Sequence, residues 1–390
     1  MDFKLSAEQI DIKNAAKEFA LGEFPDRAQE FDRNETFDLE IWKKAAKLGF
    51  VAVTVSENYG GPELGRLETC LIIEEFWAVD AGIGLSITST AFGSDLLMKF
   101  GTEEQKRKYL PPLPKGESIM GSAITEPDAG SDVTNVRTTA VRDGKEYIIN
   151  GSKMFITNGD IADYLMVLCK TNPECPKKQD QFSLFIVETD RPGFEANKLY
   201  GKLGVRACDT AEISLNEVRV PAANLIGEDE GEGFKQVMYQ FNMSRVNVSA
   251  AGVGIARAAL EESLAYAKKR VVFGQPLASF QATQFKIAEM ATLIRAARNL
   301  YYEAAWSIDN GHVDHGLIAM SKWFSGQMAV KCADEALQMH GGYGYIDEYK
   351  VQRIFRDSKI LEIYEGTKEI EKIIIARTLL GKYLEGEEKK

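Results

Sequence analysis

The sequence predicts an α+β protein of several domains: a helical domain, a mainly antiparallel and barrel-like β domain, and a second helical domain. The main observation is a change of period. Apolar residues recur every three to four positions in the first and last parts, and they alternate in short runs in between. We therefore place the domains at residues 1–117, 118–229 and 230–390, which suits the usual size of roughly 100 to 200 residues per domain.

The first domain carries four runs with a helical period, and glycine and proline interrupt this period in the stretches ENYGGPELG and PPLPKGE. The predicted helices are residues 6–24, 38–48, 66–79 and 86–100. The middle domain is predicted as short strands joined by turns such as Asp143-Gly144. These strands are residues 118–126, 138–151, 164–170, 181–190 and 211–220.

Long helical periods return after Gly233. Arg245 shares one stripe with apolar residues, and Ile287, Met290 and Ile294 form another, which is the spacing of helices that pack in a bundle. Two helical domains that embrace a β domain create an internal seam, and ligand pockets favour such domain interfaces.

The composition excludes several classes of function. With 47 basic and 58 acidic residues the net charge is -11, so nucleic acid and anionic membranes are poor partners. No apolar stretch approaches the roughly 20 residues of a membrane span, and we expect a soluble protein. Five scattered cysteines without a CxxC spacing and only three histidines argue against a disulfide framework, a metal site and a Ser-His-Asp triad. A reducing cytoplasm is the expected location.

Two stretches of the β domain carry residues suited to a ligand, and each also has a purely structural interpretation. In ITEPDAGSDV the turn Ala129-Gly130-Ser131 offers amides and hydroxyls to a flat polar ligand or a phosphate, or it is an ordinary turn after a strand. In NGSKMFITNG, Phe155 and Thr157 share one face of a strand, where they suit stacking on a ring, or they belong to a half-buried strand.

The last domain carries four further candidates. Arg245 lies on an apolar helix stripe, so it either pairs with a core carboxylate or faces the polar arm or phosphate of a ligand. Arg270 ends a predicted helix, and QMHGGYGY either lets backbone approach a ligand or caps a helix. Glu365 lies in an apolar-flanked turn before the last helix, for which Thr367 is a candidate N-cap.

Together these six stretches, in this order and at these separations, resemble the acyl-CoA dehydrogenase family over nearly the whole chain. The resemblance implies an N-terminal helical domain, a central β domain and a C-terminal four-helix bundle, with FAD as the cofactor. It implies that Glu365 removes the α-proton of an acyl-CoA thioester while FAD N5 takes the β-hydride, which gives a trans-2-enoyl-CoA. A thioester α-proton is so weakly acidic that its removal needs a positioned base, and an apolar surrounding raises the pKa of such a carboxyl.

The resemblance also assigns roles to other residues. Residues 122–131 would lie along the FAD, with Ser131 shared with CoA, and Phe155, where many relatives carry Trp, would flank the flavin ring. The other residues expected at this part of the flavin are Ile124, Thr125, Ile156 and Thr157. Thr367 and Glu369 would close the adenosine side, although relatives often have Gln at the latter position. The residues expected to reach the FAD of a neighbouring subunit, in a homotetramer built as a dimer of dimers, are Arg270, Phe273, Gln281, Gln338, Met339, Gly341 and Gly342.

The substrate side is assigned in the same way. The residues expected to bind the CoA thioester are Ser131, Asn242, Ser244, Arg245, Tyr364 and Gly366, and those expected to line the acyl pocket are Ile87, Thr88 and Ala91. No Lys or Arg occurs between Leu71 and Met98, so a glutaryl-type substrate lacks a cation and monocarboxylic chains are favoured. Small residues on the pocket helix leave room for a short, branched or alicyclic acyl group such as cyclohexanecarboxyl-CoA.

Two alternatives remain. An acyl-CoA oxidase shares the flavin site and passes its electrons to oxygen, whereas the dehydrogenase passes them to an electron-transferring flavoprotein. A non-catalytic CoA-binding helical scaffold without flavin predicts a colourless protein.

Overall fold

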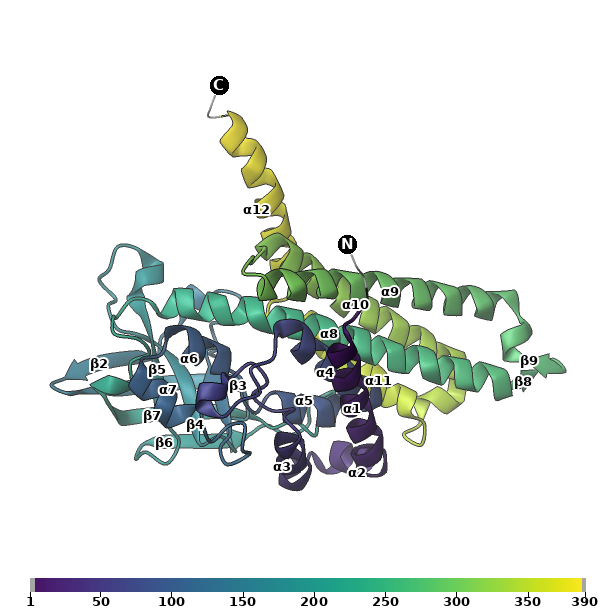
Figure 1. Ribbon diagram of the computed structural model, residues 1–390, viewed down its shortest axis with the longest axis horizontal. Coiled ribbons are helices and arrows are strands. Elements are labelled where there is room, and N and C mark those ends of the chain that lie inside the picture. Colours follow the sequence, from purple (N-terminus) through teal and green to yellow (C-terminus); the bar gives the residue numbers. More distant parts are fainter. Residues whose placement is uncertain (1–3, 388–390) are drawn as a thin grey trace.

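The computed structural model describes residues 4–387, so the outermost predicted boundaries, residues 1 and 390, lie outside it. The described chain forms a group of helices, then a seven-stranded sheet, then a second group of longer helices (Figure 1). The N-terminal helices pack against the long helices, with α4 lying along α8. The predicted order of helices, sheet and helices is confirmed.

Within residues 4–387, seven α-helices precede the sheet, and polar caps begin several of them. Ser6 and Gln9 form a capping box at the first helix, and the Asp38 carboxylate accepts hydrogen bonds from two backbone N–H groups at the third. The predicted helix 86–100 is wrong: the chain turns at residues 89–93, where Gly93 has a φ of 112°, and two helices result. The bounds are α1 (Ala7–Glu23), α2 (Pro25–Asn34), α3 (Leu39–Lys47), α4 (Arg66–Val79), α5 (Ala81–Thr88), α6 (Ser94–Phe100) and α7 (Glu103–Tyr109).

The sheet has the strand order β1-β4-β2-β3-β7-β6, and β5 pairs with the other edge of β4. Four of its pairings are antiparallel, and β1 and β2 run parallel to β4. A register shift between Lys153 and Ile156 marks an irregularity in β3. The bounds are β1 (Met120–Ala123), β2 (Thr139–Asp143), β3 (Glu146–Thr157), β4 (Tyr164–Lys170), β5 (Phe182–Glu188), β6 (Phe194–Lys198) and β7 (Thr210–Pro221).

The long helix α8 runs from the sheet domain through the whole second helical group, and the small hairpin of β8 and β9 lies at its far end (Figure 1). The last helix, α12, projects from the body (Figure 1). Among residues 4–387, no helix combines the length and apolarity that crossing a bilayer requires. The bounds are α8 (Gly233–Lys269), β8 (Val271–Val272), β9 (Gln275–Pro276), α9 (Gln281–Asp309), α10 (His315–His340), α11 (Lys350–Ser358) and α12 (Lys368–Glu387).

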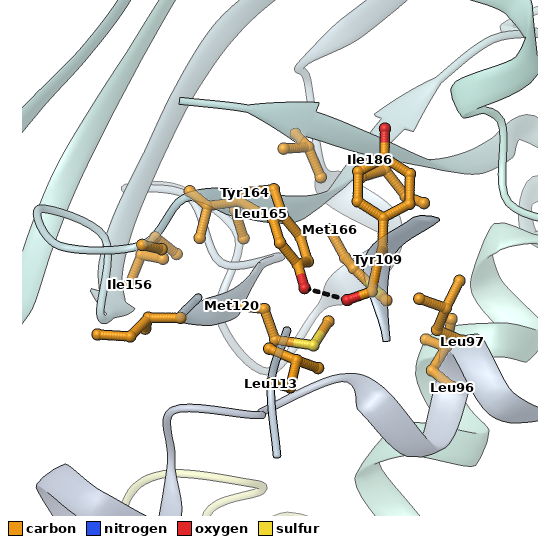
Figure 2. Close-up of a cluster of buried hydrophobic side chains, with 14 of the residues drawn as sticks. Leu96, Leu97, Tyr109, Leu113, Met120, Ile156, Tyr164, Leu165, Met166 and Ile186 are labelled. Atoms are coloured by element: carbon orange, nitrogen blue, oxygen red, sulfur yellow. Dashed lines mark hydrogen bonds between the residues drawn. The ribbon is translucent and has the colours of Figure 1, made fainter. Parts of the chain in front are cut away.

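A continuous hydrophobic core joins the first helices to the sheet. Leu96, Leu97 and Leu113 face Met120 and Met166 in Figure 2, and all five side chains are buried. The Tyr164 hydroxyl donates a hydrogen bond to the backbone carbonyl of Tyr109 across this boundary (Figure 2). Because apolar burial is the main stabilising term of folding, this shared core fixes the first helices against the sheet.

Candidate active site

Glu365 lies in a strained turn between the short helix of residues 359–362 and α12. Its backbone has a φ of 53°, in the left-handed region, and Gly366 follows with a φ of 100°. A left-handed conformation at a residue other than glycine costs roughly 1–3 kcal/mol and concentrates at functional sites. Phe155 and Phe273, which the sequence also singles out, share this feature with φ values of 60° and 50°.

The Glu365 carboxylate is half-buried and accepts a hydrogen bond from the Ser244 hydroxyl on α8. Its backbone carbonyl accepts a hydrogen bond from Arg245 Nε at 3.2 Å. Burial raises the pKa of Glu365, whereas the hydrogen bond from Ser244 and the charges of Arg245 and Lys322 act to lower it. The turn therefore presents one acid, with a raised pKa, beside α8.

A network of buried charged side chains contacts the backbone of this turn. Arg245 Nε lies 2.9 Å from Glu371 Oε1, and both side chains are buried. The fully buried Lys322 on α10 donates to the backbone carbonyl of Gly366. Of the two interpretations of Arg245 that the sequence leaves open, the structure shows pairing with a core carboxylate. Sequence reasoning missed Lys322 and Glu371, although a lysine inside the apolar helical run LIAMSKWF is a signal for a buried, paired charge.

Ser244, which donates to the Glu365 carboxylate, also lines a cavity of about 60 Å³, whereas Glu365 itself is absent from the cavity wall. Thr88 and Ala91, which the sequence predicts at the acyl pocket, line this cavity together with Gln240 and Asn247 of α8. Ile87, in contrast, is buried in the hydrophobic core and is absent from the cavity wall. The prediction that the pocket lacks a cation is wrong, because Arg66 and Asp95 also border it. Arg66 stands just before the segment Leu71–Met98 from which that prediction was made.

The sheet approaches the same cavity through α8. Gln240 Nε2 donates to the Ser122 hydroxyl at 2.8 Å, which ties the end of β1 to the cavity wall. Beyond β1, the Thr125 carbonyl accepts a hydrogen bond from the Met154 N–H in β3. The next residue, Phe155, is 67% exposed, an unusual fraction for so large an apolar side chain.

The other predicted flavin residues of the sheet domain divide by burial. Ile124 and Ile156 are buried, Thr157 is half-buried, and Ser131 is exposed next to Gly130, around which there is open space. Glu126 anchors this loop, because its carboxylate accepts hydrogen bonds from the Thr138 N–H at 2.9 Å and from the buried Lys153 ammonium at 2.9 Å. The strand and the loop thus form a firm platform with an uncovered aromatic face.

A second group of predicted residues lies at the other end of the molecule. Arg270, Met339, Gly341 and Gly342 together line a cavity where α8 ends and α10 ends. Phe273 in the β8–β9 hairpin is 97% exposed, and Gln281 and Gln338 are exposed as well. This hairpin and the sheet lie at opposite ends of the folded molecule (Figure 1). One chain therefore does not bring the two groups of predicted flavin residues together.

The remaining predicted residues lie around the Glu365 turn. The Thr367 hydroxyl accepts a hydrogen bond from the Ile370 N–H at 3.4 Å, as a helix N-cap does, and Glu369 is exposed. The Asn242 amide oxygen accepts a hydrogen bond from Arg245 at 3.4 Å, and Tyr364 is half-buried. At Gly366 any side chain would collide with Glu371, since an added Cβ would lie 2.2 Å from its Oε1.

Three family models match this chain: the N-terminal domain of acyl-CoA dehydrogenase over residues 6–117, the middle domain over 121–218 and the C-terminal domain over 231–380. The chain belongs to the acyl-CoA dehydrogenase family. It is 42% identical to the probable acyl-CoA dehydrogenase YngJ of Bacillus subtilis, over 97% of this chain and 100% of that protein.

Solved structures agree with this family relation. Butyryl-CoA dehydrogenase from Megasphaera elsdenii matches with a TM-score of 0.93 and 37% identity, over 97% of this chain and 100% of that one. A glutaryl-CoA dehydrogenase from Mycobacterium smegmatis in complex with FADH2 matches with a TM-score of 0.90 and 31% identity, over 97% of this chain and 95% of that one.

The family relation makes the chain an oxidoreductase with FAD as its cofactor. Its own residues fit a flavin. The uncovered Phe155 ring suits stacking on a flat aromatic system, and the half-buried Thr157 offers a hydroxyl two positions further along the strand. Open space around Gly130 leaves the backbone near Ser131 accessible to a polar group.

Proposed function

The family relation supports FAD-dependent dehydrogenation of an acyl-CoA thioester. We propose that Glu365 is the base that removes the α-proton and that the product is the trans-2-enoyl-CoA. The observation that carries this proposal is the position of Glu365: a strained turn holds an acid of raised pKa against Ser244, and Ser244 also contacts the cavity lined by Thr88 and Ala91. A serine cannot serve as this base itself, so its hydroxyl orients Glu365.

The residues of the chain divide the reaction between them. Glu365 in its ionised form takes the α-proton onto a carboxylate oxygen, and the raised pKa makes it a stronger base than an ordinary carboxylate. The backbone N–H of Glu365 is the proposed donor to the thioester oxygen as negative charge develops there. Arg245 and Lys322 hold the turn, so the base keeps its orientation during the step. Bound FAD supplies the acceptor for the hydride that leaves the β-carbon.

The acyl group that we propose is short or medium, branched or alicyclic, such as cyclohexanecarboxyl. A cavity of about 60 Å³ and the small side chain of Ala91 favour a compact group. In the family that this chain resembles, the members that perform a 1,4-elimination on a ring lack the glutamate that matches Glu365. They carry an Asp on the pocket helix, in the region where this chain has Ala91. Glu365 and Ala91 here favour ordinary 1,2-dehydrogenation.

The direct test is anaerobic bleaching of the flavin by a panel of straight, branched and cyclic acyl-CoAs. We expect Glu365→Gln to keep FAD and CoA binding and to lose bleaching by at least roughly a thousandfold, because general-base catalysis and correct positioning act together. The matched control is Glu303→Gln, an exposed acid on α9, which should bleach like the unchanged protein. Comparable bleaching by Glu365→Gln would overturn the assignment of the base.

The proposed partners follow from the same assignment. We propose an electron-transferring flavoprotein as the acceptor and a homotetramer, a dimer of dimers, as the assembly. Rapid reoxidation of the reduced protein by air would favour an acyl-CoA oxidase instead, and a colourless protein would favour a CoA-binding scaffold. A reducing cytoplasm remains the proposed location, supported by five cysteines that are all free.

A further inference from the structure

An ion pair borders the cavity that is proposed to hold the acyl group. Arg66 is the first residue of α4 and Asp95 the second of α6, and both line the same cavity as Ser244, the hydrogen-bond partner of Glu365. Arg66 Nη2 lies 2.7 Å from Asp95 Oδ2, and the side chains are 5% and 23% exposed. A buried pair of charges is weak evidence for stability, because desolvation offsets much of the attraction between the charges. Because stability alone does not account for this ion pair on the cavity wall, we consider a role in ligand binding.

The guanidinium of Arg66 has donors to spare. Of the five N–H groups of an arginine, one is donated to Asn247 Oδ1 at 3.2 Å and one to Asp95. Its Nε is buried and has no hydrogen-bond partner in the described part of the chain. One further N–H group on each Nη has no hydrogen-bond partner among the described residues, and an acceptor atom of a ligand in the cavity would pair with one of these groups.

The charges around these donors select the kind of acceptor. Both oxygens of Asp95 are engaged, Oδ2 by Arg66 and Oδ1 by the Thr54 hydroxyl at 2.5 Å. Asp95 thus cancels the charge of Arg66, and a second carboxylate would meet Asp95 in a poorly solvated space, where like charges repel strongly. A hydroxyl or keto oxygen accepts a hydrogen bond without bringing a charge. The pair therefore suits a neutral oxygen better than the free carboxylate of a dicarboxylic chain.

We propose that Arg66 and Asp95 form a specificity site for acyl groups that carry a hydroxyl or keto oxygen at the end remote from the thioester. The inference rests on the proposed function, since it takes the α-carbon to lie at Glu365 and the acyl group to run along the cavity from Ser244 to Arg66. The remote end of the acyl chain or ring then contacts four polar residues: Arg66, Asp95, Thr54 and Asn247.

The test compares matched substrates on two proteins. The substrates are butyryl-CoA and its terminal hydroxy derivative, cyclohexanecarboxyl-CoA and its ring-keto derivative, and glutaryl-CoA. The second protein is the double variant Arg66→Met/Asp95→Asn, which removes both charges together and so avoids leaving one of them buried alone. We expect the unchanged protein to prefer at least one oxygenated substrate over its parent by roughly 10- to 100-fold in kcat/KM, and the double variant to lose this preference.

A second measurement covers the case in which the double variant does not fold. Glu365→Gln on its own binds substrates without turning them over, so its Kd for each oxygenated and parent acyl-CoA reports the same preference. Equal affinity and equal kcat/KM for the members of each pair, or a preference for glutaryl-CoA, would overturn the inference and leave the proposed function intact. If no acyl-CoA bleaches the flavin, the proposed function fails, and this inference fails with it.

Discussion

At the scale of single residues, the candidate base depends on buried charged groups around its turn. Glu371 and Lys322 are both fully buried, and burial raises the pKa of Glu371 and lowers that of Lys322. Arg245 lies between Glu371 and the Glu365 backbone, so the charged groups hold the strained turn by way of its carbonyl oxygens. These groups orient the base, and the hydrogen bond from Ser244 lowers its pKa.

The tuning by Ser244 gives a prediction for pH. The reaction needs ionised Glu365, so its rate falls as the pH drops through the pKa of that group. The Ser244 hydroxyl lowers this pKa by hydrogen bonding to the carboxylate. Ser244→Ala removes that effect, and we expect the acid limb of the kcat/KM profile for flavin bleaching to move to higher pH.

Ser263 supplies a matched control for this experiment. It is a buried serine on the same helix, and its hydroxyl donates to the Ala259 carbonyl at 2.8 Å. Ser263→Ala should leave the acid limb where it is. A limb that stays in place in Ser244→Ala, or moves to lower pH, would show that Ser244 does not act on the base.

At the scale of elements, the contact between α4 and α8 positions both walls of the cavity. The two helices approach so closely at Gly254 that an added Cβ would lie 2.6 Å from the Glu74 carbonyl oxygen and 2.9 Å from Trp77 Cβ. Since both neighbours belong to α4, we expect Gly254→Ala to push the helices apart and to lower the free energy of unfolding by roughly 1–3 kcal/mol.

The control for that substitution is Gly22→Ala in α1, where an added Cβ meets nothing within 4 Å. It should raise the stability by up to about 1 kcal/mol, because alanine favours the helix more than glycine does. Urea unfolding of both variants, saturated with FAD, measures the difference. Unchanged stability in Gly254→Ala would mean that the helix contact adapts easily.

The same elements show how far the sequence carries. The predicted ranges of α4 and β4 match the structure, because α4 carries apolar residues at helical spacing and β4 is an almost unbroken apolar run. The predicted helix 86–100 was wrong because its period continues through a turn that tertiary contacts impose, with an added Cβ at Gly93 only 3.0 Å from Ser122 Oγ. Strand β6 escaped prediction, since its FEANK sequence has little β propensity and pairing with β7 stabilises it.

The candidate site divides in the same way. The turn that holds Glu365 was predictable, because an acid in an apolar-flanked glycine turn has a local sequence signature, while the role of Glu365 as the base stays a prediction. The partners of Arg66, Arg245 and Lys322 were not, since these charges are matched by residues on other elements that only the fold brings near. Long-range pairing of buried charges leaves no period in the sequence.

At the scale of the whole molecule, the two groups of predicted flavin residues lie at opposite ends of the folded subunit. Phe155 lies in the sheet, and Arg270 and Phe273 lie at the far end of α8 (Figure 1). If both groups bind FAD, the hairpin of one subunit must complete the flavin site of another. Phe273 is 97% exposed, so its side chain is available for such a contact.

This arrangement predicts that assembly and flavin retention fail together. We expect Phe273→Asp to place a charge in the subunit contact, to lower the mass measured by light scattering and to reduce the bound FAD measured by its absorbance. Leu21→Asp is the matched control, since Leu21 is 54% exposed on α1, which carries none of the residues predicted to bind FAD. Its mass and flavin content should stay unchanged. A Phe273→Asp protein of full mass with full flavin would show that each chain holds its FAD without help from the hairpin of a neighbour.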